Sequence, residues 1–235
     1  MAIPRNQSSI FVDLMWREVK AVVAKDLKME LRQRHSIGGV LLYIIASVFV
    51  AYLGFKQVTN VATWNALFWI IALFASFNAA ARSFSAETEG RKLYLFSLAS
   101  AEAVVVGKML YNAILLLIMV FLGFAIYILM LGSTPLLDAN WGALILSLVL
   151  GATGLSFTLT LVSALAAQTD NNLGMMAVLG LPVILPLILL IIRFSKNALD
   201  GIAWSVNGVY AWQIVAVTIL SLGLSYILFP YLWRE

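Results

Sequence analysis

Very few residues of this chain carry side chains that could do covalent or metal chemistry. His35 is the only histidine, and the chain has no cysteine. Paired-histidine metal sites, thiolate ligands, cysteine nucleophiles and histidine–carboxylate relays are therefore unavailable. His35 stands just before the first long apolar stretch, where it could be an axial haem ligand or an ordinary histidine at a membrane interface. We favour the ordinary interfacial histidine.

The only Gly-Lys pair, Gly107-Lys108, does not form a nucleotide-binding loop. A phosphate-cradling loop has the pattern G-x-x-x-x-G-K-[ST]. It would need a glycine at position 102 and a serine or threonine at position 109. Glu102 and Met109 occupy those two positions. We therefore expect no ATP site on this chain, and we expect Lys108 to mark the start of a membrane span.

Charged residues lie at the ends of the apolar stretches, where they are expected to reach water. They are Arg82, Lys108, Asp138, Asp170 and Arg193. Mid-span polarity is limited to amides and hydroxyls that are expected to hydrogen-bond within or between helices, namely Asn78, Asn112, Ser156, Thr158, Thr160 and Ser163. Ion-driven transporters usually keep ionisable groups near the bilayer midplane. The sequence therefore predicts neither an internal energy-coupling site nor an intramembrane enzyme site.

Composition indicates which elements must hold these residues. Of the 235 residues, 63% are hydrophobic and 11% charged, and the mean hydropathy is +0.98. Soluble domains average about 45–50% apolar and about 25% charged residues. A soluble enzyme, a disordered chain and a fibrous protein are thus excluded. The net charge of +4 is expected from residues that set membrane topology, so no nucleic-acid partner is predicted.

Six uncharged stretches are long enough to cross a bilayer as helices, which requires about 20 apolar residues each. Runs such as 114–120 lack the alternation of membrane strands. We predict one all-α membrane domain over 1–235, with spans near 38–55, 61–82, 107–131, 142–168, 173–193 and 209–232. All but three of the 15 lysines and arginines fall on the N-terminal side of the membrane, the exceptions being Lys56, Arg193 and Lys196. The positive-inside rule then predicts that both termini are cytoplasmic.

Two polar segments lie outside the spans. Residues 10–34 predict an amphipathic helix in the inner membrane interface, with a basic face toward anionic lipid; the alternative is a plain topology anchor. Its apolar stripe consists of Val12, Met15, Val19, Val22, Val23 and Leu27. Residues 83–106 place charges beside Leu93, Leu95, Phe96 and Leu98. This favours a short cytoplasmic helix that docks on another protein over a solvated loop.

The fifth span contains two prolines, Pro182 and Pro186. Each removes a backbone donor and clashes with the preceding turn, which predicts a kink or break. Carbonyls freed in lipid need partners, so this span is expected to pack against the bundle interior or a second subunit. Residues 194–208 fit a short re-entrant or interfacial helix, with a plain loop as the alternative.

Four stretches together form a pattern that covers about residues 15–230. They are the basic segment 28–34, the charged segment Phe84-x-x-Glu87-x-Glu89-Gly90 running on to Leu95, Gly107-Lys108, and the double-proline segment 181–188. This pattern resembles the haem exporter protein B (CcmB) family of bacterial cytochrome c maturation, permease subunits of type-2 ABC exporters. The double-proline segment is the more specific feature, whereas Glu-x-Glu-Gly is shared more widely among type-2 exporters.

The resemblance implies a role, partners and a site. The chain would be a non-catalytic, homodimeric permease of the cell inner membrane that recruits two copies of a cytoplasmic ABC ATPase, on which ATP is hydrolysed. It would work with a haem-handling membrane subunit and a small membrane peptide. Glu87, Glu89, Gly90 and Arg91 would lie at or beside the contact that couples the ATPase to the spans.

The output implied by the resemblance is haem export or release of a haem-loaded periplasmic chaperone. Haem would be cargo, and no tightly bound cofactor is implied. Two alternatives share the architecture: a type-2 exporter permease for a lipid, polysaccharide or drug, and an assembly scaffold that transports nothing.

Overall fold

The computed structural model describes residues 5–32, 34–56, 58–85, 100–167 and 172–232, and in this part of the chain it is all-helical. Seven α-helices and one short 3-10 turn are present there, without a strand. In chain order they are α1 (Arg5–Arg32), α2 (Arg34–Phe55), α3 (Val61–Ser85), α5 (Ala101–Leu131), η1 (Thr134–Leu136), α6 (Trp141–Ala166), α7 (Asn172–Leu199) and α8 (Trp204–Leu232).

Six helices are long and apolar enough to cross a membrane, so the predicted six-span all-α architecture is confirmed. The candidate spans are Gly38–Phe55, Val61–Ala81, Ala101–Leu131, Trp141–Ala166, Gly174–Leu199 and Trp204–Tyr231. Three span boundaries differ from the prediction by five or six residues, because α5 begins at Ala101, α7 continues to Leu199 and α8 begins at Trp204. The last turns of α7 stay helical because Phe194, Ala198 and Leu199 are buried in the core.

Residues 194–208 do not form the separate interfacial helix that we favoured. They comprise the end of α7, a short turn and the first residues of α8. Gly201 shapes this turn with a φ of +68°, and an added Cβ there would lie 2.7 Å from the carbonyl oxygen of Asp138. The backbone amide of Asn140 donates a hydrogen bond to the Ala198 carbonyl at 2.8 Å. The α5–α6 and α7–α8 connections are therefore bound to each other.

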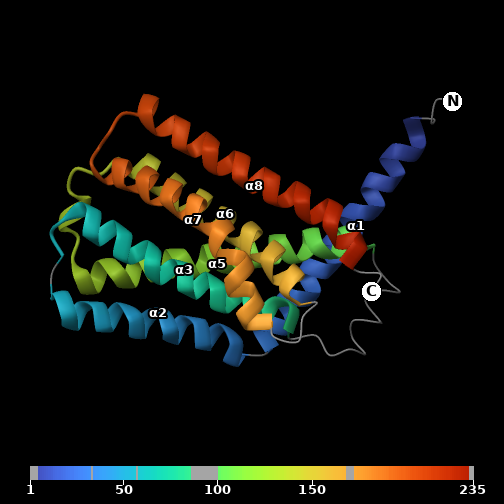
Figure 1. Cartoon of the computed structure of the whole chain (residues 1–235), viewed down its shortest axis with the longest axis horizontal. Helices are drawn as coiled ribbons and strands as arrows, with labels where there is room; N and C mark the ends of the chain where they lie inside the picture. Colours follow the sequence, from blue (N-terminus) through green and yellow to red (C-terminus); the bar gives the residue numbers. More distant parts are fainter. Residues whose placement is uncertain (1–4, 33, 57, 86–99, 168–171, 233–235) are drawn as a thin grey trace.

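The spans form one bundle with α6 at its centre. In Figure 1, α2 and α8 run along opposite edges, with the other spans between them, and α1 projects from the end at which α8 finishes. Of the most apolar 18 residues of α6, 67% are buried, against 22% of the corresponding residues of α2 and α8. Small residues allow close approach to α6: a Cβ at Gly151 would collide with the Trp69 indole, and one at Gly154 would lie 3.2 Å from Thr218 Oγ1.

Candidate functional site

The four residues predicted to couple to an ATPase, Glu87, Glu89, Gly90 and Arg91, lie outside the described residues. The structure does describe the helix that follows them, α5, and its packing partner α1. Three contacts join these two helices, and we call them together the α1–α5 seam: Glu18 to Ser100, Val22 to Gly107, and Asp26 to Lys108. The seam is the candidate site at this end of the molecule.

The first contact of the seam is at the start of α5. Ser100 is the N-cap of α5, and its own hydroxyl makes no capping bond to the helix. Instead, Glu18 Oε2 accepts hydrogen bonds from the Ser100 backbone amide at 3.0 Å and from its hydroxyl at 2.7 Å. A carboxylate is favoured there because the N-terminus of a helix carries partial positive charge.

The second contact brings the two backbones close together. A Cβ on Gly107 would lie 2.8 Å from Val22 Cγ1 and 2.9 Å from Val22 Cβ, so a side chain has no room. Val22 also belongs to a small buried cluster with Val104 and Val105 of α5, Ala164 of α6 and Phe229 of α8. The α1 helix therefore packs where three spans meet.

The third contact is a buried ion pair. Lys108 Nζ lies 4.0 Å from Asp26 Oδ2, and the two side chains are 3% and 7% exposed. Lys25 Nζ lies 3.2 Å from the other oxygen, Oδ1, within ion-pair range but without hydrogen-bond geometry. Removing one member of a buried pair is costly because it leaves an uncompensated charge. This pair therefore fixes α1 against α5.

Lys108 was expected at a water-facing boundary, and that expectation is wrong. The side chain is buried because α5 begins earlier than predicted, which places Lys108 two turns inside the helix against α1. One signal in the sequence pointed this way, since Lys108 interrupts an otherwise apolar run from 103 to 110. A charge in such a run requires a partner, but the sequence does not say which of several acids supplies it.

The N-terminal amphipathic helix is present as α1, but its stripe is used differently from the prediction. Val19 and Val22 are buried in the bundle, whereas Leu27 is exposed. The opposite face carries the exposed Arg17, Lys20 and Lys28. Part of the apolar face that we assigned to the membrane interface is therefore buried against the other helices of the protein.

The mid-span amides and hydroxyls hydrogen-bond as expected. Between helices, Asn112 Nδ2 donates to Thr160 Oγ1 at 2.9 Å, and the Thr158 and Ser221 hydroxyls lie 3.1 Å apart. Ser163 Oγ donates to the Ala80 carbonyl at 2.9 Å. These neutral bonds join α6 to α3, α5 and α8, which favours a packing role for them.

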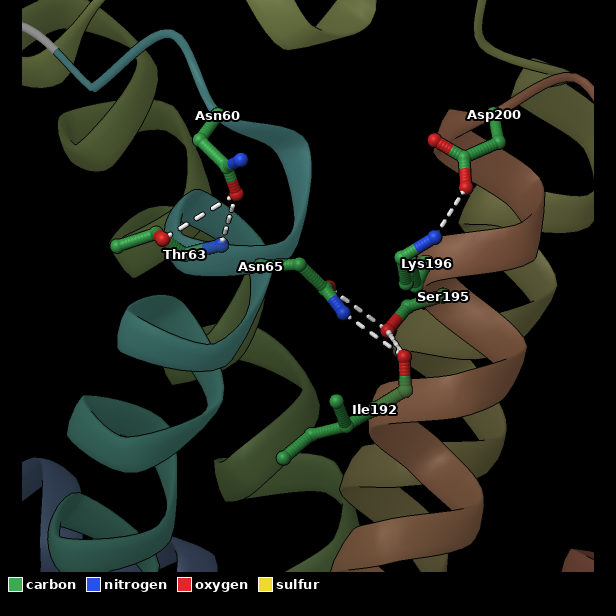
Figure 2. Close-up of polar contacts among 7 residues, drawn as sticks. All are labelled: Asn60, Thr63, Asn65, Ile192, Ser195, Lys196 and Asp200. Atoms are coloured by element: carbon green, nitrogen blue, oxygen red, sulfur yellow. Dashed lines mark hydrogen bonds and ion pairs between the residues drawn. The ribbon is translucent and has the colours of Figure 1, made fainter.

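A second polar cluster joins α3 to α7 near the opposite end of the bundle. Asn65 Nδ2 donates to the Ile192 carbonyl at 2.8 Å, and its Oδ1 accepts from Ser195 Oγ at 2.8 Å (Figure 2). Ser195 Oγ also accepts from Trp69 Nε1 at 2.8 Å. Each member of this buried cluster has a partner, so the cluster stabilises the contact between the two helices.

Both prolines of the fifth span lie inside α7, which remains helical through them. Their side chains are on the exposed face of the helix, together with Leu181, Leu185 and Leu189. The span nevertheless packs against the bundle interior, as expected, through residues on its other side such as Ile184 and Leu187, which are buried in the core, whereas the prolines face outward. Packing against a second subunit remains the prediction.

Comparison with known proteins assigns the family. A family model described as CcmB protein matches residues 17–229. The chain belongs to the CcmB family. The matched range contains all three contacts of the α1–α5 seam as well as both prolines of α7. No curated protein is similar enough to the chain to count as a match.

CcmB family membership and six apolar helices make this a multi-pass membrane protein of the haem-export and cytochrome c biogenesis class. Within the described residues, the seam is an arrangement of paired charges and close packing, without a nucleophile–base pair. Such an arrangement can transmit movement between the two helices.

Proposed function

We propose that this chain is the membrane-spanning, non-catalytic permease subunit of an ATP-binding-cassette complex for cytochrome c biogenesis. It couples ATP hydrolysis on a partner subunit to haem export or to release of a haem-loaded periplasmic chaperone. The observation that carries the proposal is the CcmB family match across residues 17–229 of a six-span chain.

The proposal includes an orientation and a set of partners. The distribution of lysine and arginine favours cytoplasmic termini in the cell inner membrane. The partners are a cytoplasmic ABC ATPase, a second copy of this chain, a haem-handling membrane subunit and a small membrane peptide. Glu87, Glu89, Gly90 and Arg91 make or adjoin the ATPase contact in this scheme, and the exposed proline face of α7 is available to the second copy.

Haem staining of covalent c-type cytochromes in cells lacking the chain tests the proposal. We expect staining to disappear and to return on re-expression from a plasmid, while an ATPase co-purifies with the chain. Normal staining with an ATPase still bound would contradict the assigned cargo and favour an exporter of another substrate. Lost staining without any associated ATPase would instead favour an assembly scaffold.

A further inference from the structure

We propose that α1 and the first two turns of α5 move as one rigid unit during the ATP cycle. Glu18, Asp26 and Lys108 are then positioning residues for the coupling step, because they hold this unit together through the α1–α5 seam. The inference rests on the proposed function, since it requires an ATPase that moves the segment before α5. It assigns to α1 a part in transmission in place of a purely anchoring role.

The spacing of the contacts carries the first step of the argument. Glu18, Val22 and Asp26 recur at every fourth position and so lie on one face of α1. Glu18 and Ser100 are 82 residues apart in sequence, and Asp26 and Lys108 have the same separation. An equal offset at both ends means that the two helices run side by side in the same direction, in step over about 12 Å.

Burial carries the second step. Asp26 and Lys108 are both buried. Val22 occupies the space that a side chain at position 107 would need. Sliding α1 along α5 would separate the ion pair and would move Val22 from Gly107 onto neighbouring positions of α5 that carry side chains. Both effects oppose sliding. Lys25, the other cation beside Asp26, lies on α1 itself and would move with it.

The place of the seam in the chain carries the third step. Ser100 directly follows, in sequence, the segment that contains Glu87, Glu89, Gly90 and Arg91. Glu18 holds the backbone amide of Ser100 as well as its hydroxyl. A displacement of that segment therefore reaches α5 and α1 together. The α1 helix ends at Arg32 and α2 begins at Arg34, so the displacement is passed on toward a second span.

Spin-label distances in the purified complex with its ATPase test the movement directly. The chain has no cysteine, so Leu14→Cys in α1 and Glu102→Cys in the first turn of α5 would be its only labelled positions when the chain is labelled before the ATPase is added. Labelled chains are diluted with unlabelled copies to remove distances between protomers. We expect the α1–α5 distance to be the same with and without ATP plus vanadate.

A second pair shows whether α1 moves at all. Leu14→Cys with Val178→Cys, an exposed residue of α7, is expected to change distance between the same two states. A changing α1–α5 distance would overturn the proposal, and so would constant distances in both pairs, because no movement would then be transmitted.

Variants of the seam test its contribution to output. Glu18→Ala removes the acceptor for Ser100, whereas Glu18→Gln keeps an oxygen that can accept. We expect Glu18→Ala to retain normal chain levels, ATPase binding and ATP turnover but to lower holocytochrome about tenfold, a typical coupling effect. Glu18→Gln should retain most of the wild-type holocytochrome output. Glu30→Gln on the same helix is the matched control.

The ion pair needs a variant that avoids an uncompensated buried charge. Asp26→Lys combined with Lys108→Asp exchanges the partners and should recover output relative to either single change. Normal holocytochrome from Glu18→Ala and from both singles, with wild-type complementation intact, would overturn the inference alone. Failure of the wild-type chain to restore cytochromes would overturn the proposed function and this inference with it.

Discussion

At the scale of single residues, the burial of Lys108 shows how one contact changes the meaning of a charge. As a boundary lysine it would only set topology. Paired with Asp26 beneath α1 it becomes part of the packing of two helices. Sequence patterns predicted the helical stripe of α1 and showed that Lys108 interrupts an apolar run. The pairing of Asp26 with Lys108 could not be predicted, because it depends on how α1 packs against α5 and the two residues are far apart in the sequence.

The fit between Gly107 and Val22 leads to a prediction about stability. Gly107→Ala places a Cβ 2.8 Å from Val22 Cγ1, so α1 must shift away from α5. Overpacking of this kind costs about 1–3 kcal/mol, which should lower the melting temperature of the detergent-solubilised chain. Gly54→Ala in α2 is the matched control because no atom lies within 4 Å of its added Cβ. Equal melting temperatures for the two variants would contradict the close contact.

Ser195 is expected to be the most sensitive member of the α3–α7 cluster. Ser195→Ala leaves Trp69 Nε1 and Asn65 Oδ1 without the hydroxyl that they share. An unsatisfied buried polar group costs about 1–3 kcal/mol. Ser76→Ala is the control, since the equally buried Ser76 hydroxyl bonds only to the Ala72 carbonyl of its own helix. Thermal unfolding of both variants would show whether Ser195→Ala is the more destabilising.

At the scale of helices, composition and charge placement predicted the six spans because apolar length alone determines whether a helix can cross a bilayer. The ends were less predictable. Packing against α1 and the core extended α5 backward to Ala101 and α7 forward to Leu199. Such extensions depend on contacts between elements distant in sequence, which hydropathy does not register.

The prolines of α7 allow a prediction at this scale. Replacing Pro182 and Pro186 with alanine restores two backbone donors and removes two steric clashes, so the helix should straighten. We expect normal insertion but holocytochrome output about tenfold lower, within the usual range of coupling effects. Pro230→Ala in the last turns of α8 is the control. Normal holocytochrome output from the double variant would mean that the two prolines have a packing role only.

At the scale of the whole molecule, the charged segment before α5 is predicted to recruit the ATPase. Reversing Glu87 and Glu89 to lysine should leave membrane insertion intact and reduce the amount of co-purifying ATPase. Repulsion replaces attraction at the contact, and like charges in an interface cost several kcal/mol. Asp138→Lys should have no such effect, because Asp138 belongs to the connection between α5 and α6, and this connection lies at the other end of α5 from Ser100 (Figure 1). Unchanged ATPase stoichiometry and turnover would mean that this segment is not the contact.

The long sequence separation of the seam contacts also determines when α1 can dock on α5 during synthesis. Every partner of α1 in the seam is translated 82 residues or more after it. At about 5–20 residues per second, that delay is about 4–16 s. During this interval Asp26 has no Lys108 to pair with, so α1 can dock only after α2 and α3 have been made. Chains truncated before α5 should therefore leave α1 open to protease.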